Sequence, residues 1–361
     1  MGLAASRTSF YLDIVKGRRT GVGASLIRAG LALPEYLLWL PLSTASRYYT
    51  LHGPTKPWRA PCPVISVGNI TAGGTGKTPM VEWLVRWLKA NHHRPAVLAR
   101  GYRATSGTSN DESQLLSGHL GDVPVLTGKD RAGSARQALA QKIANVFVLD
   151  DGFQHFAMQR DLDIVLIDCL LPFGGGHLLP RGLLREPLSA LKRAHVIVLT
   201  RCDQVQAEDR RRITDAVLAA NPSLPIVEAV HVPVGLVADG SGRPEERDLD
   251  AVRGKNVLLF SGIGNPDGFE QTVLSLGCSV AEHFRFRDHH RYFDHELTEL
   301  QQRAERACCD AALTTEKDIV KIGRCWKSRV PLFALKVQIE LVHGQDVLVP
   351  MLERVCAGRG Q

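Results

Sequence analysis

The sequence predicts an α/β protein in which helices cover both faces of a mostly parallel β-sheet. Short, continuous runs of β-branched and other apolar residues indicate strands that are buried on both sides. These runs alternate with helical stretches, as expected of parallel strands joined by crossover helices. A glycine-rich turn joins an early strand to the helix that follows it. A chain of 361 residues usually forms two domains, and its 44% hydrophobic and 22% charged content is typical of a soluble enzyme.

Most of the net positive charge lies in the first 60 residues, which contain eight Lys or Arg and two acidic residues and so carry +6, whereas the whole chain carries +7. Residues 21–47 are rich in leucine but are interrupted by Arg28, Pro34, Glu35 and Pro41. A spanning helix needs about 20 mostly apolar residues, and a charge near the bilayer centre costs roughly 2.5–3.5 kcal/mol. We therefore expect an interfacial helix, with leucines and Trp39 toward lipid and basic residues near anionic headgroups. Packing on the protein's own core is the alternative.

From residue 60 onward the pattern is strand, glycine-containing turn and helix, repeated. The predicted strands are Pro63–Val67, Ala96–Ala99, Val146–Leu149, Ile164–Ile167 and Val196–Leu199. A helix is predicted from about Pro79 to Asn91, directly after the glycine-rich turn. These elements predict an α/β/α core domain.

A second, smaller α/β unit follows, with predicted strands at Asn256–Phe260 and Ala311–Thr314 and a helix near Gly268–Ser275. The extended segments Ile226–Val237 and Leu332–Leu341 flank this unit, so we expect them to pair as a two-stranded hinge ribbon. The predicted division is a membrane-associated helical segment 1–48, a core domain 49–225, a hinge ribbon 226–240 and 331–342, a smaller domain 241–330 and a C-terminal helix 343–361.

The eight cysteines are scattered, with no Cys-x-x-Cys pair and no Cys/His spacing that would form a zinc site. We expect reduced, buried thiols, as in a cytosolic protein. Aromatic residues make up 6% of the chain, and the positive charge lies on an apolar segment rather than on a groove-sized patch interleaved with aromatics. This distribution argues against a nucleic-acid-binding protein.

The glycine-rich turn has the features of a phosphate-binding loop. It reads Thr71-Ala72-Gly73-Gly74-Thr75-Gly76-Lys77-Thr78 and is followed by a helix that Pro79 opens. In such a loop, backbone N–H groups surround phosphate oxygens, the lysine neutralises their charge and a hydroxyl reaches Mg²⁺. The strict pattern G-x-x-x-x-G-K-[ST] has glycine at the place of Thr71, but Gly73 and Gly74 supply the backbone freedom. The turn therefore predicts binding of a magnesium nucleotide.

Two acidic pairs and one histidine pair are further candidates. The strand Val146–Leu149 ends in Asp150-Asp151, at the edge where a Walker-B acid would hold Mg²⁺. No strand positions Asp111-Glu112, so its spacing alone favours a solvated loop. Asp288-His289-His290 lies in the second domain and could reach across a cleft. Because no further ligand cluster accompanies this run, a hydrogen-bonded surface histidine is the default expectation there.

Together these motifs resemble those of the tetraacyldisaccharide 4′-kinase family of lipid A biosynthesis. Seven stretches occur in the family's order between about residue 60 and residue 320, which makes the resemblance specific. They are 67–79, Arg100-Gly101-Tyr102, Asp150-Asp151-Gly152-Phe153-Gln154-His155, Leu184-Arg185-Glu186-Pro187, Gly262-Ile263-Gly264-Asn265-Pro266, Asp288-His289-His290 and Thr315-Glu316-Lys317-Asp318. The family also has Ser or Thr at the place of Thr71.

The resemblance implies transfer of the γ-phosphate of ATP to the 4′-hydroxyl of a tetraacyldisaccharide 1-phosphate. It implies a peripheral location on the cytoplasmic face of the inner membrane, where the acylated disaccharide phosphate and the anionic membrane surface are the partners. It also implies a P-loop-NTPase-like α/β/α sandwich joined by a two-stranded ribbon to a smaller α/β/α domain. We expect a monomer with no nucleic-acid partner.

The resemblance also assigns residues to the nucleotide. Lys77 would bind phosphate and Thr78 would bind Mg²⁺. Asp150 would lie on the metal side, with direct ligation by Asp150 or by Asp151 left open. Arg131 would contact phosphate. ATP and Mg²⁺ are therefore the expected cofactors.

Further residues are assigned to the acceptor. Asp111 aligns with the family's catalytic aspartate and would accept the proton of the sugar hydroxyl, with His289 as its partner. Such acid–base help is worth roughly 10²–10⁴-fold. Because His289 belongs to the second domain, the pair would form when the hinge closes. Glu186 would lie at the active site, and the family usually has a small residue where Arg181 stands, to which no role is assigned.

Two other functions remain open on the sequence alone. One is a membrane-associated P-loop GTPase or ATPase switch, because Thr200-Arg201-Cys202-Asp203 loosely matches the guanine-reading pattern Asn-Lys-x-Asp. Thr200 and Arg201 replace the Asn and Lys of that pattern. The other is a kinase of a soluble sugar, which equal activity on a deacylated acceptor would favour.

Overall fold

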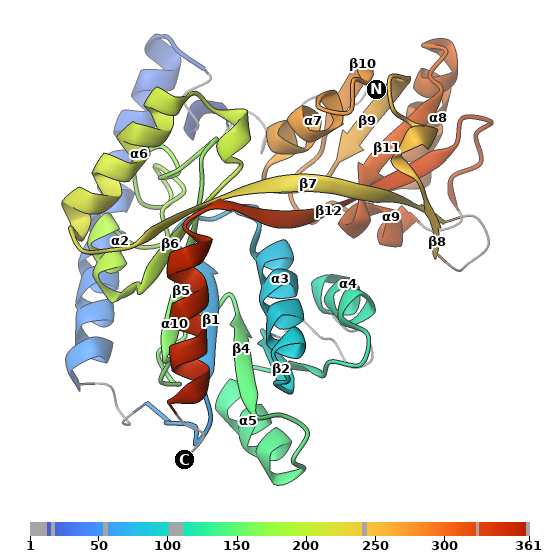
Figure 1. Cartoon of the computed structure of the whole chain (residues 1–361). Helices are drawn as coiled ribbons and strands as arrows, with labels where there is room; N and C mark the ends of the chain where they lie inside the picture. Colours follow the sequence, from blue (N-terminus) through green and yellow to red (C-terminus); the bar gives the residue numbers. More distant parts are fainter. Residues whose placement is uncertain are drawn as a thin grey trace. The chain divides into compact units, whose positions relative to one another are not determined.

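The structure, a computed structural model, describes residues 13–15, 19–52, 57–100, 111–239, 244–322 and 325–358 (Figure 1). The chain divides into two compact units. The larger unit is built from Ile14–Val230 and Ile339–Gln361, and the smaller from His231–Gln338 together with Met1–Asp13, of which only Asp13 is described. Each unit has its own hydrophobic core.

The larger unit contains a parallel sheet with the strand order β6-β5-β1-β4-β2-β3. Its strands are β1 (Val64–Asn69), β2 (Pro95–Ala99), β3 (Val125–Thr127), β4 (Val146–Asp150), β5 (Leu162–Asp168) and β6 (Val196–Thr200). Every residue of β1, β5 and β6 is buried. This explains why these strands read as continuous apolar runs in the sequence rather than as alternating ones.

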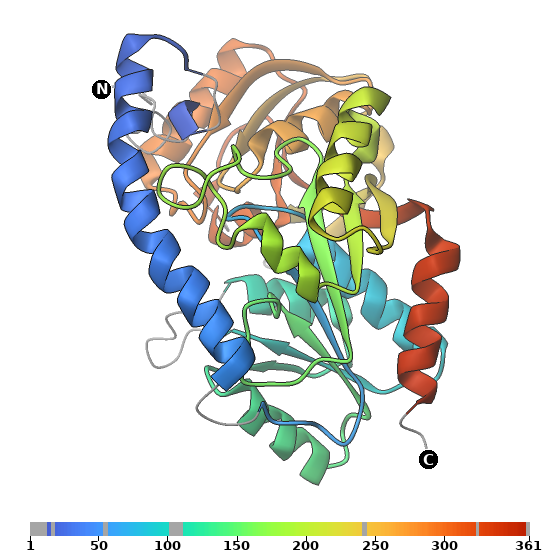
Figure 2. The same cartoon turned by 90° about the vertical axis from the view of Figure 1, so that its left-hand side faces the viewer.

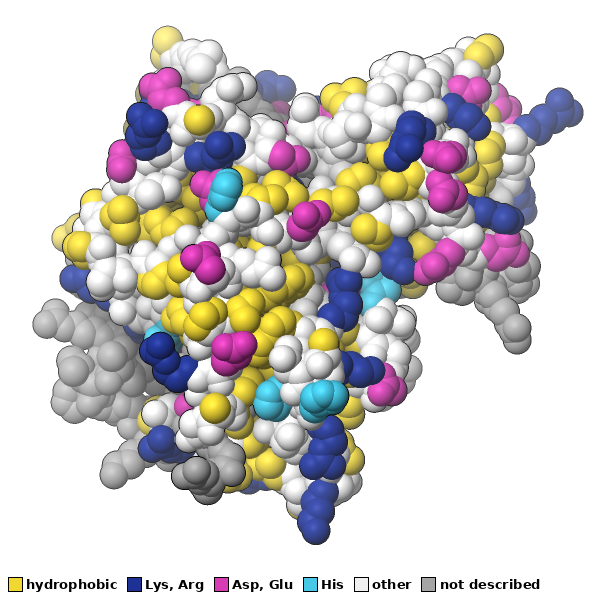
Figure 3. Space-filling view, in the orientation of Figure 1, with side chains coloured by type: hydrophobic (Ala, Val, Ile, Leu, Met, Phe, Trp, Pro, Cys, Tyr) yellow, Lys and Arg dark blue, Asp and Glu magenta, His cyan; other side chains and the backbone are white. Residues whose placement is uncertain are grey.

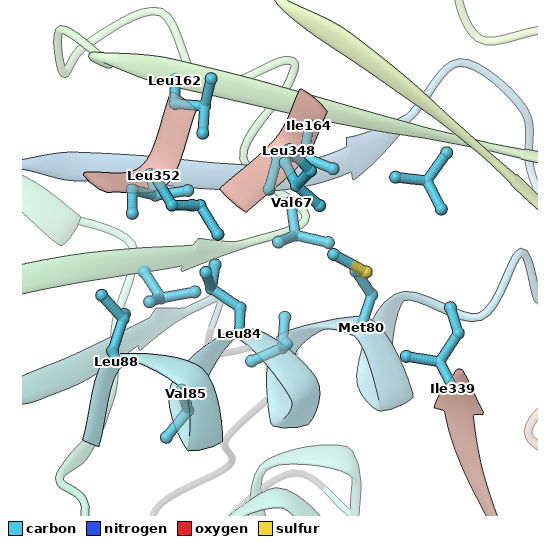
Figure 4. Close-up of a cluster of buried hydrophobic side chains, with 14 of the residues drawn as sticks. Val67, Met80, Leu84, Val85, Leu88, Leu162, Ile164, Ile339, Leu348 and Leu352 are labelled. Atoms are coloured by element: carbon cyan, nitrogen blue, oxygen red, sulfur yellow. The ribbon is translucent and has the colours of Figure 1, made fainter. Parts of the chain in front are cut away.

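Helices cover both faces of this sheet. Those on one face are α3 (Lys77–Ala90), α4 (Asp111–Leu120) and α10 (Gln345–Ala357), and those on the other are α5 (Arg131–Ala140), α6 (Ala207–Ala220) and the 3₁₀ helix η1 (Leu188–Arg193). Met80 and Leu84 of α3 point toward Val67 of β1, and Leu348 and Leu352 of α10 join them (Figure 4). Each such buried side chain contributes roughly 1.5–3 kcal/mol. The predicted α/β class is confirmed.

Helix α2 (Val22–His52) belongs to the larger unit and is one long, uninterrupted helix (Figure 2). Within the described ranges, no helix carries an apolar stretch long enough to cross a membrane. The side chains of Val22, Leu26, Leu33 and Leu37 are exposed. The predicted contact of Trp39 with lipid concerns a side chain outside the described part of the chain.

The smaller unit has a parallel sheet in the order β10-β9-β11-β12, with helices on both faces. Its elements are β9 (Asn256–Ser261), α7 (Pro266–Leu274), β10 (Ser279–Arg285), α8 (Asp294–Arg306), β11 (Ala311–Thr315), α9 (Glu316–Ile322) and β12 (Leu332–His343), with the 3₁₀ helix η3 (Leu249–Ala251) before β9. Phe269 of α7 lies in one core, and Leu297 and Leu300 of α8 lie in the other.

Two long strands pass from one unit into the other. β7 (Ile226–Asp239) and β12 are neighbours in the hydrogen-bonded strand order, and each contains a boundary between the units. β8 (Pro244–Arg247) pairs with β7 in antiparallel fashion. β7 and β12 occupy the segments predicted to form a hinge ribbon, whereas β8 lies outside them, and hinge motion itself stays a prediction.

All eight cysteines are unbridged. Five are buried, but Cys308 and Cys325 are exposed, so the prediction of buried thiols is wrong for these two. Cys308 lies in the turn after α8 with φ +48°, and Cys325 follows α9, so neither belongs to an element that packs on a sheet.

The face of the molecule seen in Figure 3 interleaves acidic and basic side chains among the residues that are described. Exposed ion pairs also occur among the described residues, such as Arg212 with Glu208. The basic excess of the sequence is therefore not gathered on this face.

Candidate functional site

The segment between β1 and α3 is a tight glycine turn at the carboxyl edge of the sheet. Gly73 has φ +128°, and Gly76, the N-cap residue of α3, has φ +89°. Glycine adopts such positive φ values without strain. The first turn of α3, all of it described, has no acidic residue. The positive end of the helix dipole and the N–H groups of the turn both attract negative charge here, so the segment is suited to bind an anion.

Lys77, the first residue of α3, is held between the ends of two strands. Its Nζ donates to Asn69 Oδ1 at 3.2 Å and lies 3.5 Å from Asp151 Oδ1. Asn69 is buried at the end of β1, and its amide nitrogen donates to the carbonyl oxygen of Thr71 at 2.7 Å. The lysine is thus fixed beside the glycine turn by contacts with β1 and with the residue after β4.

The acidic pair lies at the end of β4, close to two arginines. NH1 of Arg185 donates to both carboxylate oxygens of Asp151, at 3.1 and 3.0 Å, and NH1 of Arg131 donates to the main-chain carbonyl of Asp151 at 3.2 Å. Burial raises the pKa of Asp151, but Lys77, Arg185 and Arg131 lower it by more, so its pKa lies below the ordinary value. Burial lowers the pKa of Arg131, an effect that Asp150 and Asp151 oppose. Asp151 is therefore ionised at neutral pH.

Glu186 is a buried carboxylate with several donors. Arg193 donates through NH2 to both of its oxygens, at 3.0 and 2.8 Å. Gln154 Nε2 donates to Glu186 Oε1 at 2.9 Å and to the carbonyl oxygen of Asn69, also at 2.9 Å. The Arg193 guanidinium also lies over the ring of Phe153, at 4.6 Å. Through Gln154, Glu186 is connected to the residue that holds Lys77.

A second ion pair supports the glycine turn from its carbonyl side. Arg201 NH1 lies 2.7 Å from Asp168 Oδ2 and donates to the carbonyl oxygen of Gly74 at 3.3 Å. Thr200 Oγ1 donates to the carbonyl oxygen of Thr75 at 3.1 Å. Asp168 and Arg201 are both buried, at the ends of β5 and β6. The segment that loosely matched a guanine-reading pattern therefore holds the glycine turn in place.

We expect Arg201→Ala to lower the free energy of unfolding by about 3 kcal/mol, because it leaves the Asp168 carboxylate buried without its partner. The double variant Arg201→Ala/Asp168→Asn should recover part of this loss. Urea unfolding of the three proteins measures the effect. Arg212→Ala is the control, since its exposed pair with Glu208 should be worth less than about 1 kcal/mol. Equal losses in the single and the double variant would contradict the argument.

His155, at the end of the motif that begins with Asp150, is half-buried among cations. Burial, together with Arg131 and Arg160, lowers its pKa from 6.5 to about 4. An unfolded chain would bind this proton near pH 6.5, whereas the folded chain binds it only near pH 4. Protonation therefore favours the unfolded state. We expect the contribution of His155 to be constant above pH 6.5 and to become destabilising as the pH falls toward 4.

Urea unfolding at about pH 7.5 and about pH 5 checks this expectation. His155→Gln should lose less stability between the two pH values than the parent does. His343→Gln is the control, because His343 is exposed. An unchanged pH dependence in His155→Gln would assign the acid sensitivity to other groups.

The prediction of a loop at Asp111-Glu112 is wrong, because α4 begins at Asp111. The helix is stabilised from outside its own sequence, since Leu116 and Leu120 pack in the core against α3. His119 of α4 also contacts Glu82 of α3, with Nδ1 2.6 Å from Oε1. The side chain of Asp111 lies outside the described part of the chain, as do Gly101 and Tyr102 of the quoted motifs.

His289 lies in the smaller unit, in the turn between β10 and α8. It has φ +58°, and its main-chain N–H donates to the carbonyl oxygen of Gly262 at 3.1 Å. The fully buried Asp318 accepts from the N–H of Gly262 at 2.9 Å and from Thr315 Oγ1 at 2.7 Å. The His289 side chain is exposed. The backbone of this histidine is therefore fixed by three of the sequence motifs acting together.

The larger unit thus brings together many of the predicted site residues. They are the turn Thr71–Thr78 with Lys77, the pair Asp150-Asp151, Arg131 and Glu186. Sequence reasoning missed Asn69, Gln154, Arg185, Arg193 and Arg201 as parts of this network. Asn69, Gln154 and Arg185 stood inside the quoted motifs, where their polarity beside buried strands was a usable signal. No local pattern marked Arg193, whereas Arg201 directly follows a fully buried strand.

Comparisons with known proteins agree with the family that the sequence motifs resemble. The family model described as Tetraacyldisaccharide-1-P 4′-kinase matches residues 30–357. The chain belongs to this family. The resemblance found from the motifs is therefore confirmed.

Relatives in the tetraacyldisaccharide-1-P 4′-kinase family match nearly the whole chain. The tetraacyldisaccharide 4′-kinase of Anaeromyxobacter sp. (strain Fw109-5) is 39% identical over 357 residues, which are 94% of this chain and 95% of that protein. The kinase of Halothermothrix orenii is 35% identical over 369 residues, 94% of this chain and 96% of that one. The crystal structure of LpxK from Aquifex aeolicus in complex with ATP is 28% identical, with a TM-score of 0.67, over 91% of this chain and 99% of that chain.

Proposed function

We propose that this protein transfers the γ-phosphate of ATP to the 4′-hydroxyl of a tetraacyldisaccharide 1-phosphate in lipid A biosynthesis. The observation that carries the proposal is the position of Lys77, at the opening of α3, between Asn69 and the carboxylate of Asp151. An ammonium group held at a helix N-terminus, beside an acidic pair at a strand end, is the arrangement used for phosphoryl transfer. The family to which the chain belongs supports the choice of acceptor.

The turn 71–78 suits the phosphates of ATP. Among the described residues, the buried hydroxyl of Thr75 has no hydrogen-bond partner, although it lies between Gly74 and Gly76. Buried polar atoms are rarely left unpaired, so a ligand oxygen is a fitting partner. The N–H groups at the start of α3 and the Lys77 ammonium would surround the terminal phosphates.

The donors near Lys77 also fit Mg²⁺. Mg²⁺ usually takes one or two protein carboxylates together with substrate phosphates and water. Thr78, Asp150 and Asp151 offer a hydroxyl and two carboxylates at the required edge. Among the described residues, no group of three or more His, Cys, Asp or Glu is arranged to hold a metal by itself. When bound with ATP, Mg²⁺ neutralises charge on the β- and γ-phosphates.

The remaining chemistry belongs to side chains of the protein. The bond between the γ-phosphorus and the ADP oxygen breaks as the sugar 4′-oxygen bonds to phosphorus. Lys77 and Arg131 would stabilise the negative charge on the transferring group and on ADP. Asp111 would take the proton that leaves the sugar hydroxyl. We keep His289 as its proposed partner, in the role that the family resemblance implies.

Helix α2 is oriented like a membrane-surface helix. Over its described side chains, residues 22–37, the charged residues are Arg28 and Glu35, which lie seven positions apart and hence on one face. Both bond to the protein: Arg28 to the carbonyl oxygens of Ile14 and Arg19, and Glu35 to Arg181. Val22, Leu26, Leu33 and Leu37 lie on the opposite face, where they are 79%, 67%, 66% and 62% exposed. In an ordinary surface helix, the apolar face packs on the protein and the charged face is exposed to water. We propose that this apolar face lies in the anionic cytoplasmic surface of the inner membrane.

We expect Leu26→Gln/Leu33→Gln to lower affinity for vesicles containing anionic lipid by roughly tenfold or more. When α2 binds the membrane, the two leucine side chains move from water into lipid, and the glutamines would lose this favourable transfer free energy. Sedimentation with vesicles measures this binding. Leu274→Gln, which changes a partly exposed leucine of α7, is the control. Undiminished vesicle binding by the double variant would remove α2 from the membrane contact.

Transfer of label from [γ-³²P]ATP to purified tetraacyldisaccharide 1-phosphate tests the proposed function directly. The expected product carries label on the 4′-oxygen and forms with ATP far more readily than with GTP. Equal turnover of the deacylated disaccharide would favour a kinase of a soluble sugar instead. GTP hydrolysis without any acceptor, and no labelled lipid, would favour a GTPase switch.

A further inference from the structure

We propose that the ion pair between Glu35 and Arg181 is a positioning contact that fastens α2 to the wall of the phosphate-binding turn, so that the seating of α2 sets the rate of phosphoryl transfer. The proposal rests on the proposed function. Glu35 and Arg181 touch neither reactant in it; they act through the loop 171–186, which links the two sites.

Glu35 is bound by three donors from one short stretch of this loop. Arg181 NH1 donates to Oε2 at 3.1 Å, the N–H of Leu178 donates to Oε1 at 3.0 Å, and His177 Nδ1 lies 3.2 Å from Oε1. The Glu35 side chain is 17% exposed and that of Arg181 30%. Burial raises the pKa of Glu35, but these donors lower it by more, and the carboxylate is ionised at neutral pH. Three directional bonds define where this turn of α2 lies.

The loop that receives Glu35 is closely packed on itself. The N–H of Leu184 donates to the carbonyl oxygen of His177 at 3.0 Å, and the N–H of Leu183 donates to that of Gly174 at 2.7 Å. A Cβ on Gly182 would meet the carbonyl oxygen of His177 at 2.0 Å, so the two sides of the loop touch. Such a segment moves as one body rather than absorbing a displacement.

The other side of the same loop forms the wall of the phosphate-binding turn. The N–H of Ala72 donates to the carbonyl oxygen of Leu183, and the N–H of Arg185 donates to that of Ile70, both at 2.7 Å. Arg185 then holds the Asp151 carboxylate with two bonds. A shift at Arg181 is therefore passed through a continuous set of contacts to the turn and to Asp151.

Polar contacts contribute to the position of α2 because, over residues 22–37, its stripe of large apolar side chains points away from the protein. Helices of this kind usually gain their fixed position by burying an apolar stripe. Here that stripe is exposed, and the inward face carries Arg28 and Glu35 beside the half-buried Leu31 and Ala32. Removal of the Glu35–Arg181 pair should thus loosen the loop while leaving the membrane-facing residues unchanged.

A double-mutant cycle tests the proposal, with Glu35→Gln, Arg181→Gln and the combined variant assayed on acceptor dispersed in detergent. We expect each single change to lower kcat about tenfold and the combined change to lower it no further. Because the same turn binds the nucleotide, affinity for ATP with magnesium should also fall, by no more than about tenfold, whereas vesicle binding should not change. Arg181→Lys keeps one charged donor and should regain most of the rate.

Arg212→Gln, in an exposed pair on α6, is the matched control and should leave kcat unchanged. The proposal would be overturned if both single variants kept the parent kcat. It would also be overturned if the fold loss of kcat in the combined variant equalled the product of the two single losses. A rate loss that follows a lowered melting temperature and disappears on cooling would overturn it too, since the pair would then be only structural. If the proposed function itself were wrong, the parent protein would not label the acceptor. That outcome differs from a failure of the positioning proposal, in which the parent protein labels the acceptor normally.

Discussion

Lys77→Ala should lower kcat for phosphate transfer by roughly 10²–10³-fold, the effect of deleting one fixed donor that stabilises transition-state charge. The ammonium lies beside the glycine turn and contacts Asn69 and Asp151, whereas Arg131, the other proposed stabiliser of this charge, bonds to the main chain of Asp151 and stays in place. The fold should persist, because Asp151 keeps both bonds from Arg185. Label transfer to the lipid acceptor under saturating ATP gives kcat, and calorimetry with ATP and magnesium gives the affinity.

Lys89→Ala is the control for this change. Lys89 lies on the same helix, near its other end, and pairs with Asp122 at the surface. Its removal should leave kcat unchanged. A Lys77→Ala protein that labels its lipid as fast as the parent would exclude phosphoryl transfer at this turn.

Asp111→Asn should lower kcat by roughly 10²–10⁴-fold, while KM for ATP stays nearly constant. The substitution keeps the size of the side chain but removes the group that is proposed to accept the sugar proton. It should also abolish the acidic limb of the pH–rate profile, which a merely structural aspartate would leave in place. Steady-state label transfer across a range of pH measures both effects.

Asp122→Asn is the matched control, since Asp122 is an exposed carboxylate two residues beyond α4. If Asp111→Asn retained the parent kcat, Asp111 would have no part in the chemistry. His289→Gln, in the other unit, should lose rate without weakening ATP binding, and a normal rate would remove it as the partner of Asp111.

Several strands could be predicted because each contains a short, continuous apolar run, whereas β8 (Pro-Glu-Glu-Arg) and β10, which has polar residues inside it, have no such run and were not predicted. Val196–Leu199 is an example of such a run, and the observed strand extends it by one residue, to Thr200. The glycine turn was equally readable, because Gly73 and Gly76 have the backbone angles that only glycine adopts easily. Local sequence carries both kinds of information.

The start of α4 could not be predicted in the same way. Its sequence has a weak apolar pattern, and the helix is stabilised by packing of Leu116 and Leu120 against α3, which lies more than twenty residues earlier. The partner of Arg181 was also out of reach, because Glu35 is 146 residues away and no periodicity connects them. Contacts of this kind depend on the folded arrangement alone.

The support behind the glycine turn has a consequence for nucleotide binding. Arg201 and Thr200 hold the carbonyl groups of Gly74 and Thr75, so this stretch of backbone is ordered by the protein itself. Fixing one residue's backbone costs roughly 1–2 kcal/mol of conformational entropy. Because the turn is already ordered in the folded protein, this entropy cost does not reduce the free energy of binding an incoming triphosphate. Changes at the ends of β5 and β6 can therefore weaken nucleotide affinity without altering any atom that the nucleotide touches.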